Sequence, residues 1–248
     1  PEAAATWLAS LEPDLRFQVI DGLADGWAAV DPAAAAAFSA QLDEGDLHGG
    51  FLSAVARQWA SYDPPAAAAW AGGLLREEQV EETFVEVGEN WARQDPEAAA
   101  RWVEKQTDPG RARWALEGVG RGWATHDPPG ALDWILSQEN VDARDRQELV
   151  MEVVDAWFDA EPAALPAWLD RRKPGPSTDL SLRAFSAAVV EIDPVAAMAW
   201  GAKISDENAR LGHLRDLGRA WIATEGIEAI EAMKALKLSF DPETLLGE

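Results

Sequence analysis

The chain has 248 residues, 13 of them tryptophan and none cysteine, and a formal net charge of -23. The lack of cysteine excludes disulfides, thiol catalysis and cysteine-ligated metals, and the charge argues against binding nucleic acid or anionic membranes. No stretch approaches the roughly 20 continuous apolar residues of a membrane span, and no signal-peptide pattern begins the sequence, so we expect no membrane insertion. The chain starts without Met and inside a repeat. We therefore expect a fragment of a longer protein, and its compartment stays open.

A unit of about 32 residues repeats along the chain. Its markers are six prolines and one glycine, spaced 32, 32, 32, 34, 32 and 32 residues apart: Pro32, Pro64, Pro96, Pro128, Pro162, Pro194 and Gly226. The full unit reads Trp-x-x-x-Asp-Pro-x-x-Ala-x-x-Trp, and twelve of the 13 tryptophans occupy its two Trp positions. Because this register is so strict, we expect these twelve side chains to pack in the core.

Each copy predicts two helices. A short first helix is expected to begin at Asp-Pro, because aspartate is a favoured N-cap and proline suits the first helical position. A longer second helix is expected to run up to the next Trp. Its apolar face consists of residues four and seven positions before that Trp, a helical spacing. They are Leu23, Val55, Val87, Val119, Val153, Phe185 and Leu217, with Ile20, Leu52, Phe84, Leu116, Val150, Leu182 and Leu214.

No segment alternates with period two, so we predict no sheet. One helix pair cannot bury its own apolar face, whereas stacked pairs share a continuous core. The predicted fold is all-α: a right-handed α-solenoid of about seven helix-turn-helix repeats, forming a single domain over 1–248. Residues 234–248 are expected to be either a cap or the start of a following segment.

In architecture the chain resembles the tetratricopeptide (TPR) and HEAT-like helical-hairpin superfamily over essentially its whole length. It departs from the TPR pattern because its unit has 32 residues and its proline begins the first helix. It looks closer to the Trp-rich Asp-Pro repeats of uncharacterised bacterial proteins. This resemblance implies a helical fold and is nearly silent on activity.

Two irregularities supply the candidate partner-binding residues. Trp114 is off register, nine positions before Trp123, in a mostly polar column that includes Glu82 and Glu148. We therefore expect this column to be exposed and Trp114 to contact a partner, or else to fill a local groove. The second irregularity is a two-residue insertion between Glu139 and Arg146, followed by the only basic cluster, at 171–173. Arg171, Arg172 and Lys173 are contact candidates, although neutral loop drift is the alternative, and a hinge or bend is expected between Asn140 and Ser177.

Charges two positions before the register Trp alternate in sign in five successive copies. We expect them to form a ladder that sets register: Asp25, Arg57, Glu89, Arg121 and Asp155. Gly118, Gly120 and Gly122 are interpreted as close-packing positions, since no strand precedes them as in a dinucleotide-binding loop. The three histidines fall far apart in the register and lack metal-ligand spacing. We predict no catalytic residue, no cofactor and no metal.

The functional prediction is a non-catalytic protein-protein interaction or scaffold module, monomeric, that binds a protein or peptide. Its charge favours a basic or extended segment as the ligand. One alternative is a passive structural spacer within a larger repeat protein. The other is a helical-toroid glycan hydrolase or lyase that uses paired carboxylates.

Overall fold

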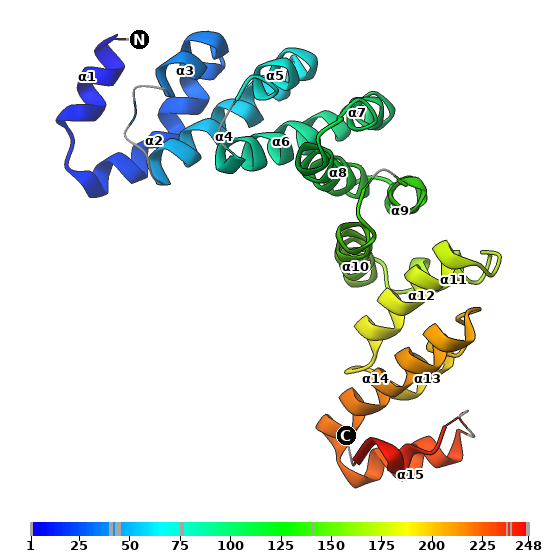
Figure 1. The fold of residues 1–248 in the computed structure, drawn as a ribbon. Coiled ribbons are helices and arrows are strands. Elements are labelled where there is room, and N and C mark those ends of the chain that lie inside the picture. Colours follow the sequence, from blue (N-terminus) through cyan, green and yellow to red (C-terminus); the bar gives the residue numbers. More distant parts are fainter. Residues whose placement is uncertain are drawn as a thin grey trace. The chain divides into compact units, whose positions relative to one another are not determined.

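A computed structural model describes the chain apart from residues 1, 40, 41, 43–45, 75, 76, 140, 237, 239, 247 and 248. Every regular element in the described part is helical, and no strand occurs there (Figure 1). The all-α prediction is therefore confirmed, and helices that are neighbours in sequence pack together as expected for helical repeats.

The helices gather into two compact units, where the sequence predicts one domain. Unit 1 comprises Pro1–Ala131 and Gln138–Asp142, and unit 2 comprises Leu132–Ser137 and Ala143–Glu248. The boundary divides α9 (Pro128–Ser137). It coincides with the stretch after Trp134 in which the regular repeat is interrupted by two extra residues.

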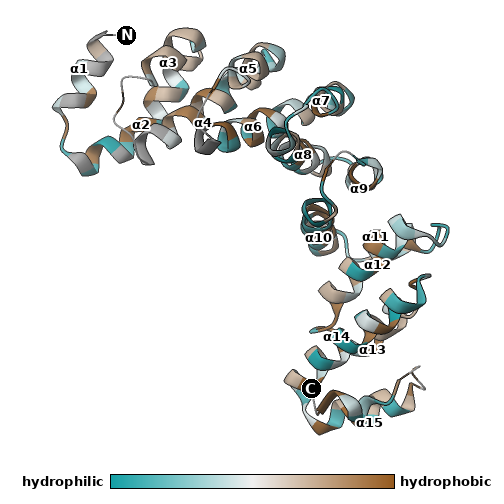
Figure 2. Cartoon of the chain, viewed as in Figure 1, coloured by the Kyte–Doolittle hydropathy of each residue, from teal (hydrophilic) through white to brown (hydrophobic). Residues whose placement is uncertain are grey.

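Unit 1 is built from hairpins whose second helices also pack on one another, α2 on α4, α4 on α6 and α6 on α8. Its helices before α9 are α1 (Glu2–Ser10), α2 (Pro13–Ala28), α3 (Pro32–Ser39), α4 (Asp46–Ala60), α5 (Pro64–Ala71), α6 (Glu77–Ala92), α7 (Pro96–Val103) and α8 (Pro109–Ala124). Figure 2 shows hydrophilic and hydrophobic residues on the same helices, such as α6 and α8. Such mixed helices bury one face and leave the other to solvent.

Unit 2 continues the same pattern. Its helices after α9 are α10 (Ala143–Ala160), α11 (Ala164–Leu169), α12 (Pro176–Val189), α13 (Pro194–Gly201), α14 (Glu207–Glu225), α15 (Ile227–Ala235) and a 3₁₀ helix, η1 (Pro242–Leu246). The 3₁₀ helix packs on α14 and α15 and buries Leu245. Lys234 also pairs with Glu243 at 2.6 Å. Residues 242–246 thus belong to the packed end of unit 2.

The Asp-Pro steps begin helices as predicted. Asp63, Asp95 and Asp193 each accept a hydrogen bond from the backbone N–H three residues later, at 3.2, 2.9 and 2.9 Å. The copy at Pro162 is the exception, because α11 begins only at Ala164 and lacks a side-chain cap. Two features explain the delay: glutamate replaces the capping aspartate, and Pro166 has no N–H to donate back to the carbonyl of Pro162.

The two register aromatics of a hairpin pack against each other. Ring centroids lie 5.6 Å apart for Trp59 and Trp70, 5.9 Å for Trp91 and Trp102, and 5.7 Å for Trp157 and Trp168. An offset aromatic pair buries a large apolar area and adds a geometric preference. The strict Trp spacing in the sequence therefore corresponds to the packing of two aromatic rings within each of these hairpins. The core prediction holds in full only for Trp102, Trp157, Trp168 and Trp221, which are buried, whereas seven other register tryptophans are half-buried and Trp7 is 47% exposed.

The predicted close packing of glycines is confirmed in unit 1. A Cβ atom at Gly118 would stand 2.3 Å from the carbonyl oxygen of Val85, and one at Gly122 equally close to that of Glu89. Helices α6 and α8 therefore meet backbone to backbone. Gly88 contributes from the other side, where a Cβ would lie 3.0 Å from the backbone nitrogen of Val119.

Candidate ligand-binding groove

Three helices of unit 2, α10, α12 and α14, border a groove of about 250 Å³. Its lining is mostly apolar. Met151 comes from α10, Leu180 and Ala184 from α12, Val190 directly follows α12, and Leu217 comes from α14. Met151 is 40% exposed, an unusual position for a long apolar side chain. The groove therefore offers apolar surface that the folded chain leaves open.

The sequence of α14 explains why the groove exists. Where α8 carries Gly118 and Gly122 at five and one positions before its Trp, α14 carries Asp216 and Ala220. Eight positions before the Trp, α8 has Ala115 and α14 has His213. Because these side chains are larger, α14 cannot approach α12 backbone to backbone as α8 approaches α6.

His213 spans the space between the two helices. Its Nε2 lies 2.7 Å from Oγ of Ser186 on α12, and both residues are buried. Oγ of Ser186 also lies 2.6 Å from the carbonyl oxygen of Leu182, so the hydroxyl stands between the backbone of α12 and the imidazole. Burial, reinforced by the positive charge of Arg183, lowers the pKa of His213 to about 4 although Asp216 opposes the shift. The imidazole is neutral at pH 7.

The Ser186–His213 contact joins α12 to α14, because it is buried and connects one side chain of each helix.

Arg183 is the one cationic group among the residues that line the groove. Its Nε is buried and has no hydrogen-bond partner among the described residues. Asp216, the carboxylate of the lining, pairs instead with Arg219 at 2.9 Å, and its side chain is 68% exposed. The wall thus presents a guanidinium that the described part of the chain leaves without a counter-ion.

The six residues singled out by the sequence lie elsewhere, and none lines this groove. Trp114 was expected on an exposed face, and this is wrong, because it is only 6% exposed. Its ring lies over Gly110 on the preceding turn of α8, where a Cβ would be 3.5 Å from Cη2 of Trp114. The indole thus packs back onto its own helix, whereas the polar residues of its column in other copies predict exposure.

The charged candidates make local contacts. Glu82 accepts a hydrogen bond from Ser53 at 3.0 Å, and Glu148 pairs with Arg144 along α10 at 2.9 Å. Arg172 pairs with Asp133, and its guanidinium lies 4.6 Å from the ring centroid of Trp168. Through the last contact, the Arg172 side chain packs on Trp168 of its own hairpin.

Arg171 and Lys173 are exposed at the turn between α11 and α12. Trp114 and Glu82 belong to unit 1, and the other four candidates belong to unit 2. In unit 1, Trp114 and Glu82 lie on the adjacent helices α8 and α6, but one is buried and the other exposed.

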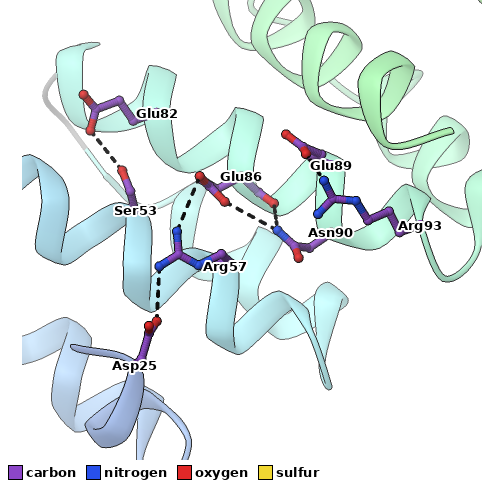
Figure 3. A network of polar contacts seen from close by, with 8 residues as sticks. All are labelled: Asp25, Ser53, Arg57, Glu82, Glu86, Glu89, Asn90 and Arg93. Carbon is purple, nitrogen blue, oxygen red and sulfur yellow. Dashed lines mark hydrogen bonds and ion pairs between the residues drawn. The ribbon is translucent and has the colours of Figure 1, made fainter. Parts of the chain in front are cut away.

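The predicted charge ladder is present at its first rung. Arg57 pairs with Asp25 at 3.3 Å, and its other nitrogen reaches Glu86 at 4.0 Å (Figure 3). Glu89, the residue expected on the next rung, pairs with Arg93 on its own helix. The polar network thus links α2, α4 and α6, with Glu86 rather than Glu89 as a contact of Arg57. Burial raises the pKa of Glu86 although Arg57 opposes the shift.

Sequence reasoning missed the groove, although signals for it exist. Leu180 is apolar in the polar column of Glu82 and Glu148, and Ala187 interrupts the column of alternating charges. Both residues line the groove. The signal for the groove was therefore an apolar residue at a position where other copies have polar residues.

No described helix has both the length and the apolar character that crossing a membrane requires. The described residues also contain no group of three or more histidine, aspartate or glutamate side chains suited to a metal ion. Comparisons with protein-family models, curated proteins and solved structures find no match to this chain.

Proposed function

We propose that this chain is a non-catalytic protein-protein interaction module, built as a right-handed α-solenoid of Trp-rich Asp-Pro repeats. Its ligand is an extended peptide segment of a partner protein. The observation that carries the proposal is the groove between α10, α12 and α14, which combines open apolar surface with an unpartnered cation. Apolar pockets with a few polar groups are the usual form of binding sites.

The charge of the chain supports a protein partner that is basic as a whole. A net charge of -23 attracts cationic proteins over distances of about a Debye length, roughly 8 Å at physiological ionic strength. Such attraction raises the rate of encounter more than it raises affinity. Affinity and choice of segment then depend on the groove.

The contacts of the buried polar groups support a binding role over a catalytic one. The buried Ser186–His213 pair joins α12 to α14. Asp179, buried on α12, accepts hydrogen bonds from both N–H and Oγ of Ser205 and from N–H of Asp206, so it serves as a structural brace.

The experiment is a selection from a phage-displayed library of random dodecapeptides on the full chain. Ala187 lines the groove and is exposed, so Ala187→Trp fills it. The matched control is Ala37→Trp, at an exposed alanine of α3 in unit 1. We expect the wild type and Ala37→Trp to enrich the same peptides and Ala187→Trp to lose them. If no peptide is enriched, the passive spacer is the better description, and if Ala187→Trp binds as well as the wild type, the groove is not the binding site.

A further inference from the structure

We infer that the groove recognises a peptide segment in which an acidic side chain stands next to a large apolar one. The carboxylate pairs with Arg183, and the apolar side chain packs against Met151 and Leu180. This inference rests on the proposed function and names the chemistry of the bound segment. Arg183 and Met151 occupy the same position in two copies of the repeat. The other copies have unrelated residues there, so no repeat pattern marks these two: Asp21, Ser53, Val85, Glu117 and Arg215.

The first step is the state of Arg183. Its Nε is buried without a hydrogen-bond partner in the described residues, and its positive charge is sensed at His213. A buried donor left unsatisfied is unfavourable, and a charged one more so. The Nε is covered by the protein's own atoms, so a ligand carboxylate meets the terminal nitrogens of the guanidinium, where it can accept hydrogen bonds and balance the charge. Among peptide groups, an acidic side chain therefore complements Arg183 best.

The second step is that no lining group of the protein fills this role. The polar groups on the groove are Gln147 from α10, Arg183 from α12, and His213 and Asp216 from α14. Gln147 is uncharged, and His213 is neutral and hydrogen-bonded to Ser186. Asp216 is mostly exposed and pairs with Arg219. The place beside Arg183 is thus left to an external anion.

The third step is size, which favours a peptide over a small molecule. The groove measures about 250 Å³, and ligand pockets for drug-sized molecules span about 300–1,000 Å³. This volume accommodates one large apolar side chain beside a carboxylate.

The acidity of the chain does not oppose this choice. Repulsion between exposed charges is largely screened beyond about 8 Å at physiological ionic strength, whereas a contact pair against apolar walls is screened much less. A partner that is basic overall therefore meets the acidic surface at long range, and its acidic-apolar segment meets the groove in contact.

The test uses the same dodecapeptide library on the wild type, Arg183→Gln, Arg183→Lys and Ala187→Trp, each verified as folded by circular dichroism. We expect wild-type peptides to place Asp or Glu next to Leu, Met or Phe. Arg183→Gln should lose the acidic preference and keep the apolar one, and Arg183→Lys should retain it in part. The most enriched peptide is then synthesised together with its amide counterpart, Glu to Gln or Asp to Asn. Fluorescence anisotropy should show about tenfold weaker binding of the amide peptide to the wild type and no difference for Arg183→Gln.

Two results overturn the inference, and they differ in what they leave standing. If Ala187→Trp abolishes binding but the wild-type peptides show no acidic preference, the groove binds peptides by other chemistry and the proposed function stands. If no peptide is enriched, or if Ala187→Trp has no effect, both the inference and the proposed function fail.

Discussion

Gly118 of α8 lies against Val85 of α6 so closely that a methyl group on its α-carbon would stand 2.3 Å from the Val85 carbonyl oxygen. Real Cβ atoms do not come so near a backbone oxygen, and the obstacle is the helix itself rather than a movable side chain. This backbone contact sets the separation of α6 and α8. It also shows what the α12 and α14 pair lacks, since α14 has Asp216 at the position of Gly118.

We therefore expect Gly118→Ala to destabilise unit 1 by about 1–3 kcal/mol, because the two helices must move apart to accept the methyl group. Gly22 on α2 is the matched control, since a Cβ there meets no atom within 4 Å. Gly22→Ala should stabilise by about 0.5–1 kcal/mol through helix propensity. Urea unfolding followed by tryptophan fluorescence measures both changes. A Gly118→Ala protein as stable as the wild type would contradict the close approach.

Neighbouring repeats are also joined by a recurring hydrogen bond. Tyr62 donates its hydroxyl to the carbonyl oxygen of Ala28 at 2.8 Å, and Gln94 donates to that of Ala60 at 2.9 Å. Ala28 and Ala60 are the last residues of α2 and α4, so each side chain satisfies a carbonyl at the end of the preceding second helix.

Tyr62→Phe keeps the ring and removes this donor, so we expect a loss of about 0.5–1.5 kcal/mol in the free energy of unfolding. Ser61→Ala is the control, because the Ser61 hydroxyl donates only to Gln58 of its own helix end, at 2.7 Å. Chemical denaturation compares the two variants, and amide hydrogen exchange near Ala28 should quicken in Tyr62→Phe alone. Equal exchange in both variants would show that the bond does not couple the repeats.

Glu86 offers a test of a partly buried ion pair. Burial raises its pKa above the ordinary value, and Arg57 only partly offsets that cost. The folded state therefore holds its proton more tightly than the unfolded state, so stability falls as pH rises through this pKa, and the cost is fully present at pH 7. We expect Glu86→Gln, which resembles the protonated acid, to be more stable than the wild type at pH 7, with the difference vanishing below about pH 4.

Denaturation at several pH values measures this effect, with Glu148→Gln as the control. Glu148 forms an exposed pair with Arg144 on its own helix, its side chain 61% exposed, so its loss should change stability by less than about 1 kcal/mol. If Glu86→Gln is the less stable protein at pH 7, the ion pair with Arg57 outweighs the burial of the carboxylate.

His213 predicts an acid-sensitive unit 2. Its pKa is lowered to about 4 in the folded protein from 6.5, so between these values the unfolded state binds the proton more readily. Stability is then complete above about pH 6.5 and falls as pH decreases toward 4, by at most about 3 kcal/mol. His213→Gln keeps an amide donor for Ser186 and removes the titration.

We expect the difference in unfolding free energy between His213→Gln and the wild type to grow in favour of the variant as pH falls from 7 to 4.5. Taking the difference between the two proteins cancels the carboxylates that titrate in the same range. A constant difference across this range would mean that His213 is protonated in the folded state or that it is not buried.

Much of the local structure followed from the sequence. The Asp-Pro steps predicted helix starts at Pro32, Pro64, Pro96, Pro128 and Pro194, because capping and a fixed proline φ act within one helical turn. The exception at Pro162 is also local in origin, since Pro166 withholds an N–H. The close-packing role of Gly118 and Gly122 was predictable as well, because a helix has few other uses for closely spaced glycines on one face.

The sites were harder to predict. The column of Trp114 is polar in other copies and predicts exposure, but this indole packs over Gly110 of its own helix and is buried. Arg172 seemed available for a partner, yet Trp168 and Asp133 hold it. These outcomes depend on individual neighbours rather than on the repeat.

By itself, then, the sequence determined the helical class and the starts of the first helices at Pro32, Pro64, Pro96, Pro128 and Pro194, since capping and proline geometry act within one helical turn. The tertiary structure decided which helices come into backbone contact and where a groove opens. Helix separation depends on the summed bulk of facing side chains, such as Gly118 against Val85 in unit 1 and His213 against Ser186 in unit 2. That sum can be evaluated only when the two facing helices are in place. The lack of a partner for Arg183 at the groove is likewise evident only in the folded structure.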